Sequence, residues 1–383
     1  MHYSILLAIV IALFSCQGHN ETQTGAEQVE IYLPLLEGKT IAVVGNHTSL
    51  IGETHIVDSL LCYGVDISGV FAPEHGFRGE VDAGTYVDDD FDAKTGVPIV
   101  SLYGKHKKPT SEDLEGVDLV LFDIQDVGVR FYTYISTLHY VMEACAENNV
   151  PLLVLDRPNP NGGYVDGPIL EEEHSSFIGM HPIPVVYGMT IGELAQMING
   201  EGWLTKAKKC DLTVIPCSNY YHGKFYFLPV SPSPNLPNNH AIWLYPSTCF
   251  FEGTVISEGR GTMMPFEVFG HPDLPGDFSY TPLSIPGMST HPKLEGVECH
   301  GKDLRTFVPD ESWNQLYLHW LIDAYNIFPD QENFFIPFFE KLAGTNTLRQ
   351  QIVSGMTAEE IRESWQDDLE DYNRMRKLYL LYQ

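Results

Sequence analysis

The stretch FAPEHGFRGE, residues Phe71 to Glu80, shows how this chain is organised. The apolar run Ile67–Ala72 leads into it with the composition of a buried strand and stops at Pro73. The polar side chains that follow at once are Glu74, His75 and Arg78. Ligands of an open parallel sheet bind outside the carboxyl ends of its strands, so this stretch predicts a site with Glu74 as its strongest candidate. The alternative is a solvated polar loop.

Other β-branched runs alternate with helical patterns along the first half of the chain. The predicted strands are Thr40–Gly45, Ile67–Ala72, Pro98–Leu102, Asp118–Phe122, Pro151–Leu155 and Leu212–Ile215. The predicted helices are Glu53–Tyr63, Tyr132–Asn149 and Thr190–Asn199, the last with Thr190 as its N-cap. This alternation predicts an α/β fold, a Rossmann-like parallel sheet covered by helices on both faces. No G-x-G-x-x-G or Walker A sequence occurs, and no metal-binding spacing, so we expect no cofactor.

Polar residues also follow three further predicted strands. They are Asn46 and His47, then Asp123, Asp126 and Arg130, then Asp156 and Asn159. Because parallel strands end at one edge of the sheet, we expect these side chains to gather there. The alternatives are structural: Asp123 and Asp126 could cap a helix beginning near Phe131, and Asp156 could pair with Arg157.

The chain changes character after Cys217. The segment Asn219–Leu244 is rich in Pro, Asn and Tyr and includes Asn235, which indicates a domain junction. The stretch PSTCFFEGTVISEGRGT, Pro246 to Thr262, then places Glu252, Glu258 and Arg260 among small residues. A short strand at Leu294–Cys299 and helices at Ser312–Asn326, Pro337–Ala343 and Ala358–Tyr382 complete a smaller α/β domain. We therefore expect a Rossmann-like domain over residues 29–217 and a C-terminal domain over residues 218–383.

The N-terminus has the pattern of an export signal. The apolar segment Ile5–Phe14 is too short for a membrane span and ends at LFSC, which resembles a bacterial lipobox with Cys16 as the lipidated residue. We expect residues 1–16 to be a signal peptide, residues 17–28 a polar tether, and the protein a lipoprotein of the periplasm or outer membrane. Ordinary secretion is the alternative. Cys210 and Cys217 could form a disulfide there.

Charge narrows the range of partners. The chain carries 22 basic and 51 acidic residues, a formal net charge of −29. This balance disfavours nucleic acid and anionic membrane surfaces as partners. An anionic ligand would therefore need an arginine placed close to it.

Several of these stretches together resemble a known enzyme family. They are FAPEHGFRGEVDAG, FDIQDVGVRFYTYISTL, LDRPNPNGG, VDGP, GMTIGELA, NLPN and FEGTVISEGRGT. In this order and spacing, from about Glu30 to the C-terminus, they are similar to the exo-β-N-acetylmuramidases of the NamZ type. The resemblance implies a Rossmann-like domain joined to a smaller C-terminal domain, with the active site in the cleft between them. It also implies release of N-acetylmuramic acid from the non-reducing end of peptidoglycan fragments without metal or nucleotide, with Glu74 as the acid/base.

Glycoside hydrolysis assigns further roles to the candidate residues. A second group must act as nucleophile or activate water, and Asp123, Asp126, Glu258 or the acetamido oxygen of the substrate could do so. The lactyl carboxylate of the substrate needs a cation, for which Arg78 is favoured over Arg130 and Arg260. The remaining candidates for glycan contacts are His75, Asn46, His47, Asp156, Asn159, Asn235 and Glu252.

Two other functions fit the same residues. One is a lipoprotein that binds cell-wall glycans without cleaving them. The other is a metal-dependent amidase assembled from His47, His75, Asp123 and Asp126.

Overall fold

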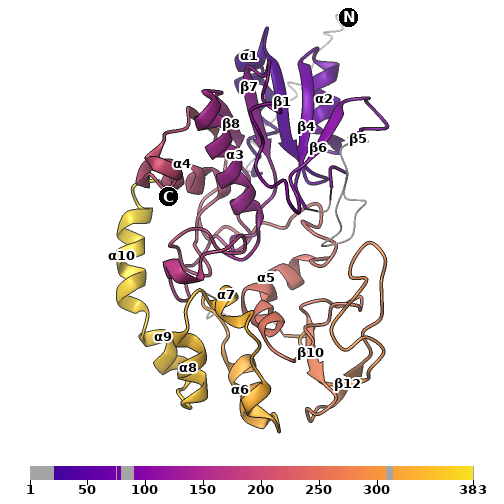
Figure 1. Cartoon of the computed structure of the whole chain (residues 1–383), viewed down its shortest axis with the longest axis vertical. Coiled ribbons are helices and arrows are strands. Elements are labelled where there is room, and N and C mark those ends of the chain that lie inside the picture. The colour runs from indigo at the N-terminus through magenta and orange to yellow at the C-terminus, as the bar shows by residue number, and fades with distance from the viewer. Residues whose placement is uncertain (1–20, 75, 79–89, 308–313, 383) are drawn as a thin grey trace, which may run out of the picture.

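A computed structural model describes residues 21–74, 76–78, 90–307 and 314–382. Figure 1 shows two stacked parts, with a sheet domain at the top, in indigo to magenta, and a smaller part below it, in orange and yellow. The sheet has the strand order β5-β6-β4-β1-β7-β8-β9. Its members are β1 (Thr40–Gly45), β4 (Asp66–Ala72), β5 (Asp90–Phe91), β6 (Pro98–Ser101), β7 (Leu119–Asp123), β8 (Leu152–Leu155) and β9 (Leu212–Ile215).

Six of these strands are parallel, and only the short edge strand β5 runs antiparallel. Counted along the chain, the parallel strands lie in the order 3-2-1-4-5-6, which is the Rossmann arrangement. The predicted fold is therefore confirmed, and all six predicted strands lie within one or two residues of the observed ones. The order reverses between β1 and β7, so the crevice of the sheet opens where these two strands end.

Side chains alternate between two apolar cores on opposite faces of the sheet. In β1, Ala42 and Val44 pack into the larger cluster, whereas Ile41 and Val43 pack into the other. The helices of this domain are α1 (Val29–Leu36), α2 (Ile56–Cys62), α3 (Tyr134–Asn148) and α4 (Ile191–Glu201). It also contains a small hairpin, β2 (Leu50–Ile51) with β3 (Thr54–His55), and the 3-10 turns η1 (Glu172–His174) and η2 (Thr205–Ala207). The predicted start of α4 is confirmed, because Thr190 and Glu193 form a reciprocal capping box.

The expected tether is wrong for residues 21–28. Gln23 and Ser218 exchange two backbone hydrogen bonds of 3.0 and 2.9 Å, and Thr24 and Ala26 are buried. The Gln28 side chain also donates to the carbonyl of Pro216 at 2.6 Å. This segment therefore belongs to the sheet domain, next to the end of β9.

The C-terminal part combines helices with a small antiparallel sheet. The helices are α5 (Asn239–Thr248), α6 (His319–Ile327), α7 (Phe339–Ala343), α8 (Thr347–Val353), α9 (Ala358–Glu363) and α10 (Gln366–Arg376), with the 3-10 turns η3 (Cys249–Gly253) and η4 (Gln331–Asn333). The sheet order is β10-β12-β11, formed by β10 (Val268–His271), β11 (Phe278–Tyr280) and β12 (Cys299–Asp303).

Three predicted elements of this part differ from the structure, and one of them, the helix expected at Ser312–Asn326, begins only at His319. The strand expected at Leu294–Cys299 begins only at Cys299, because Leu294 has a φ of 56° and cannot continue an extended strand. The single helix expected over residues 358–382 is broken into α9 and α10 at Trp365, whose indole nitrogen donates to Asp166 at 2.9 Å.

The two parts are packed tightly against each other. The larger core cluster contains strand residues such as Val44 and helix residues such as Phe250. After α10, which runs along the left edge of Figure 1 towards α4, the chain ends with the Tyr382 hydroxyl donating to Asp156 at 2.5 Å. The boundary expected at residue 217 stays a prediction. Within the described ranges, no helix is both long and apolar enough to cross a bilayer.

Candidate functional site

A pocket of about 200 Å³ lies between the two parts, at the carboxyl end of the parallel strands. Its walls come from the segment after β4, the start of α3, the Pro-rich junction before α5, and the loop after η3. The lining residues are Glu74, Phe131, Tyr132, Thr133, Tyr134, Ile178, Ser233, Asn235, Leu236, Tyr245, Glu252, Arg260 and Phe266. Aromatic walls with a few polar groups are typical of small-molecule sites.

A larger depression of about 630 Å³ lies at the opposite edge of the sheet, between α1 and the starts of β1 and β4. None of the candidate residues lines it. Since parallel sheets place ligands at the carboxyl ends of their strands, the smaller pocket is the candidate functional site.

Glu74 directly follows β4 and is half-buried in the pocket wall. The Tyr103 hydroxyl donates a hydrogen bond to its carboxylate, and burial together with this negative charge raises the pKa of Tyr103 to about 12. Burial and the charge of Glu74 also raise the pKa of Tyr134. Both phenols therefore keep their protons at neutral pH, and the hydrogen bond from Tyr103 holds the Glu74 carboxyl in place.

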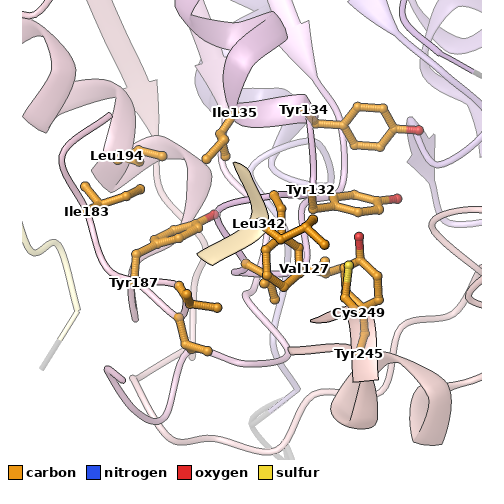
Figure 2. Close-up of a cluster of buried hydrophobic side chains, with 14 of the residues drawn as sticks. Val127, Tyr132, Tyr134, Ile135, Ile183, Tyr187, Leu194, Tyr245, Cys249 and Leu342 are labelled. Carbon is orange, nitrogen blue, oxygen red and sulfur yellow. The ribbon is translucent and has the colours of Figure 1, made fainter. Parts of the chain in front are cut away.

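Tyrosines form one wall of the pocket. The rings of Tyr132 and Tyr134 meet edge to face with centroids 4.9 Å apart, and Figure 2 shows one above the other with both hydroxyls on the same side. The Tyr132 hydroxyl donates to the carbonyl of Pro232 at 2.9 Å. Tyr245 from α5 packs at 6.1 Å from Tyr132 and at 4.8 Å from Phe266. The wall therefore joins the two domains.

The EGRGT loop contributes a charged cluster to the pocket, where Arg260 lies over the ring of Phe266. Nε and Nη2 of Arg260 both lie 2.7 Å from Glu252 Oε1, and Nε lies 3.7 Å from Glu258. Lys293 pairs with the buried Glu258 at 2.8 Å. Burial disfavours the charged guanidinium, but the two glutamates outweigh it and raise the pKa of Arg260. Arg260 thus stays charged, with its Nη1 making no hydrogen bond to the described part of the chain.

Gly259 allows the backbone conformation of this loop. Gly259 has a φ of 82°, and a Cβ there would lie 2.6 Å from the carbonyl oxygen of Met264. A side chain at this position would displace the neighbouring Arg260 from the pocket.

Four predicted residues line the pocket: Glu74, Asn235, Glu252 and Arg260. Glu258 lies behind Arg260 and is buried. Asn235 donates from Nδ2 to the carbonyl of Met288 at 2.7 Å, whereas its buried Oδ1 has no hydrogen-bond partner among the described residues. The pocket therefore offers an acceptor for a ligand N–H or O–H group.

The other arginines are engaged elsewhere. Arg78, the favoured partner of the lactyl group, instead binds Asp92 at 2.7 Å and Asp58 at 3.0 Å and does not line the pocket. Arg130 is fully buried and donates to the carbonyls of Pro168, Ile183, Leu342 and Ala343 at 2.6 to 3.0 Å. The sequence prediction ranked these two first because it could not see their partners.

The predicted aspartates are also held inside the sheet domain. Asp123 is fully buried and accepts from Arg157 Nε and Nη2 at 2.6 and 2.9 Å, so Arg157 pairs with Asp123 rather than with Asp156. Asp126 accepts from the Tyr187 hydroxyl and from the Gly128 amide, and burial raises its pKa to about 7. Neither aspartate caps α3, whose N-cap is Thr133, and neither lines the pocket.

The remaining candidates hold loops in place. Asp156 accepts from the hydroxyls of Thr190 and Tyr382, and Asn159 donates to the carbonyl of Met189 at 2.8 Å. Asn46 accepts from Thr48 at 2.9 and 2.6 Å, and the ring of His47 contacts the carbonyl of Ser231 at 2.8 Å. None of these four lines the pocket. His75 lies outside the described residues.

Cys210 and Cys217 do not form the expected disulfide, and the described members of the expected metal site do not form a cluster. Cys210 and Cys217 are free thiols, and the Cys217 sulfur contacts the carbonyl of Asp156 at 3.3 Å. Over the described ranges, the cluster of possible metal ligands is the surface group of Glu171, Glu173 and His174. It does not include His47, Asp123 or Asp126.

Sequence reasoning missed the tyrosines and Ser233. Tyr132 and Tyr134 were assigned to the predicted helix, although α3 begins only at Tyr134. Three aromatic residues within Phe131–Tyr134 exceed what one apolar helix face needs, and this density was the available signal. Tyr103 carried no signal, since it follows β6 without any motif.

A carboxyl bonded by Tyr103 in an aromatic, arginine-bearing pocket fits the class of the glycoside hydrolases. Two family models match the chain, "Exo-beta-N-acetylmuramidase NamZ, N-terminal" over residues 41–240 and "Exo-beta-N-acetylmuramidase NamZ, C-terminal" over residues 243–382. The chain therefore belongs to the NamZ family of exo-β-N-acetylmuramidases.

Similar proteins agree with this assignment. The chain is 41% identical to the peptidoglycan β-N-acetylmuramidase NamZ of Bacillus subtilis (strain 168), over 94% of this chain and 92% of that protein. Its fold matches the crystal structures of two DUF1343 family proteins from Bacteroides fragilis NCTC 9343. The first has a TM-score of 0.88 and 48% identity over 95% of this chain and 99% of the other. The second has a TM-score of 0.82 and 28% identity over 94% and 99%.

Proposed function

We propose that the pocket cleaves N-acetylmuramic acid from the non-reducing end of peptidoglycan fragments, with Glu74 as the general acid. The observation that carries this proposal is the position of Glu74 in a small pocket, held by Tyr103 and faced by an aromatic wall. A confined pocket suits an exo-acting enzyme, because it takes one terminal sugar, whereas an internal sugar would need an open groove.

In this mechanism Glu74 protonates the glycosidic oxygen as the bond to the anomeric carbon breaks. Tyr103 holds the carboxyl in the orientation that this transfer needs. Water then adds to the anomeric carbon, and its proton returns to Glu74. Glu74 and Glu252 are the carboxylates that line the pocket among the described residues. Glu252 or the substrate's own acetamido oxygen therefore acts as the nucleophile or activates the water.

Substrate selection is assigned to Arg260 and Asn235, which both line the pocket. Arg260 meets the lactyl carboxylate, since its Nη1 is not used by Glu252 or Glu258. The Oδ1 of Asn235 accepts the acetamido N–H, which satisfies an acceptor that is otherwise buried without a partner.

The test is Glu74→Gln assayed on two substrates. The rate on a natural muramyl disaccharide should fall about a hundredfold to ten-thousandfold, since the leaving alkoxide needs a proton. A nitrophenyl muramide should be affected much less, because nitrophenolate leaves unprotonated. Glu201→Gln serves as a matched control, since Glu201 does not line the pocket. Equal, small losses on both substrates would remove Glu74 from the acid role, and turnover lost with a chelator would favour a metal-dependent hydrolase.

We also propose that the protein is a lipoprotein of the cell envelope, anchored through Cys16. The support is the apolar segment Ile5–Phe14 followed by LFSC. One acyl chain gives only marginal membrane binding, so stable anchoring needs a further chain or a second contact. The protein should partition into the detergent phase, and Cys16→Ala should abolish this. Identical partitioning of the two proteins would contradict the anchor.

A further inference from the structure

Two phenylalanines in the junction before α5 face solvent. Phe225 is 71% exposed and Phe227 is 63% exposed. Both rings contact the indole of Trp243 on α5, with centroids 5.6 Å away in each case. We call these three residues the aromatic patch. Phenylalanine side chains are rarely left in water, so such a patch indicates a contact surface.

The backbone holds this patch in place. Residues 224–228 alternate, with Phe225 and Phe227 exposed and Lys224, Tyr226 and Leu228 turned inward. Leu228 is buried, and its amide donates to Asn239 Oδ1 at 2.8 Å. The Lys224 ammonium donates to the carbonyl of Asn219 at 2.6 Å. These contacts hold the backbone of the segment in the conformation that leaves Phe225 and Phe227 exposed.

The patch lies beside the start of the described chain. Asn219 Nδ2 donates to the carbonyl of Glu21 at 3.1 Å, and the Thr22 hydroxyl donates to the carbonyl of Asn219 at 3.1 Å. A continuous set of contacts thus runs from Glu21 through Asn219 and Lys224 to Phe225.

The length of the chain before Glu21 limits how far the proposed anchor can lie from this side of the protein. Cys16 is five residues from Glu21, so an extended chain places it at most about 17 Å from Glu21. A lipid on Cys16 would hold this face of the protein against the bilayer.

From these observations we infer that the aromatic patch of Phe225, Phe227 and Trp243 inserts into the surface of the membrane that holds the Cys16 lipid. This inference rests on the lipid anchor proposed above. Aromatic side chains favour the interface between lipid headgroups and acyl chains. The net charge of −29 disfavours an electrostatic contact with anionic lipid, so the contact is apolar and suits a zwitterionic surface.

The contact would also set the position of the pocket. Helix α5 carries Trp243 in the patch and Tyr245 in the pocket wall. A helix with its side chains is about 10 Å across, so docking of the patch would hold the pocket close to the bilayer surface. The enzyme would then act on fragments near the membrane.

The test uses the processed full chain reconstituted into phosphatidylcholine vesicles that contain acyl-brominated lipid. Bromine quenches indoles within the bilayer, and the difference between wild type and Trp243→Phe isolates the signal of Trp243. Wild type should show quenching of Trp243, and Phe225→Ala/Phe227→Ala should lose most of it. Transfer of this variant between vesicles should be about tenfold faster than that of wild type.

The matched control is Ile31→Ala/Leu35→Ala, which removes two exposed apolar residues, 50% and 41% exposed, from α1. It should behave as wild type. Unquenched Trp243 in wild type, or equal transfer rates for the two double variants, would overturn the inference while leaving the anchor intact. A chain that never floats with vesicles would overturn the anchor and this inference together. Hydrolysis of a soluble muramide is read separately, and its loss in Phe225→Ala/Phe227→Ala would reassign the patch to glycan binding.

Discussion

Removing Arg260 should abolish much of the preference for N-acetylmuramic acid over N-acetylglucosamine. Glu252 Oε1 lies 2.7 Å from both Nε and Nη2 of this arginine, which leaves Nη1 as the nitrogen that faces the lactyl carboxylate. A single hydrogen bond between charged groups contributes about 1.5 to 3 kcal/mol. Arg260→Ala should therefore lower the ratio of kcat/KM for the muramide to that for the glucosaminide by about 10-fold to 150-fold.

The variant also leaves Glu252 without its partner, and this unpaired carboxylate would repel the lactyl group further. The double variant Arg260→Ala/Glu252→Gln separates the two effects, since it removes the repulsion and keeps the loss of the donor. A loss of rate from the proposed catalytic role of Glu252 affects both substrates and cancels in the ratio. Arg260→Lys should recover only part of the ratio, because a lysine cannot bind Glu252 and the substrate with the same fork. Arg78→Ala is the matched control, since Arg78 binds Asp58 and Asp92 outside the pocket. An unchanged ratio in Arg260→Ala, with equal losses on both substrates, would refute the assignment.

Two further predictions concern groups outside the pocket. Burial raises the pKa of Asp126 to about 7, so the folded protein holds this proton more tightly than the unfolded chain, where an aspartate titrates near 3.9. The stabilisation that this proton gives the folded protein is complete below about pH 4 and is lost as the pH rises through about 7. The unfolding free energy of wild type should therefore fall by about 3 kcal/mol more than that of Asp126→Asn between pH 5 and pH 8, as measured by urea denaturation. A difference between the two proteins that does not change with pH would contradict this. Arg130→Met should lower the unfolding free energy by about 3 kcal/mol or more, because four buried carbonyls lose their donor. The substrate preference of the enzyme that still folds should stay unchanged. A stable variant with altered preference would instead place Arg130 in substrate binding.

The fold was largely readable from the sequence because its signals are local. Parallel strands buried on both faces require continuous apolar runs, and β1 and β9 lie where those runs predicted them. The start of α4 was equally local, since Thr190 and Glu193 cap the helix from within the same turn. The strand expected at Leu294 failed because a positive φ there is set by the surrounding loop and not by residue type.

The site was readable only in part. Glu74 and Arg260 lie in stretches whose glycines and charged residues identify loops with a function, and both line the pocket. Arg78 lies in the same kind of stretch, yet its guanidinium is bound by Asp58 and Asp92, 20 and 14 positions away. No pattern within the FAPEHGFRGE stretch shows that Glu74 lines the pocket whereas Arg78 does not.

By itself, the sequence determined the parallel sheet, the strand ends that carry polar residues, and the place of Glu74 directly after a strand. These follow from periodicity and from side-chain chemistry within a few residues. Only the tertiary structure decided which charges remain available to a substrate. Arg130 and Asp123 are bound by groups far away in the chain, whereas the walls of the pocket meet through Tyr132 and Tyr245, 113 positions apart. Burial and pairing depend on what the other domain brings to a side chain, and that information is not local in the sequence.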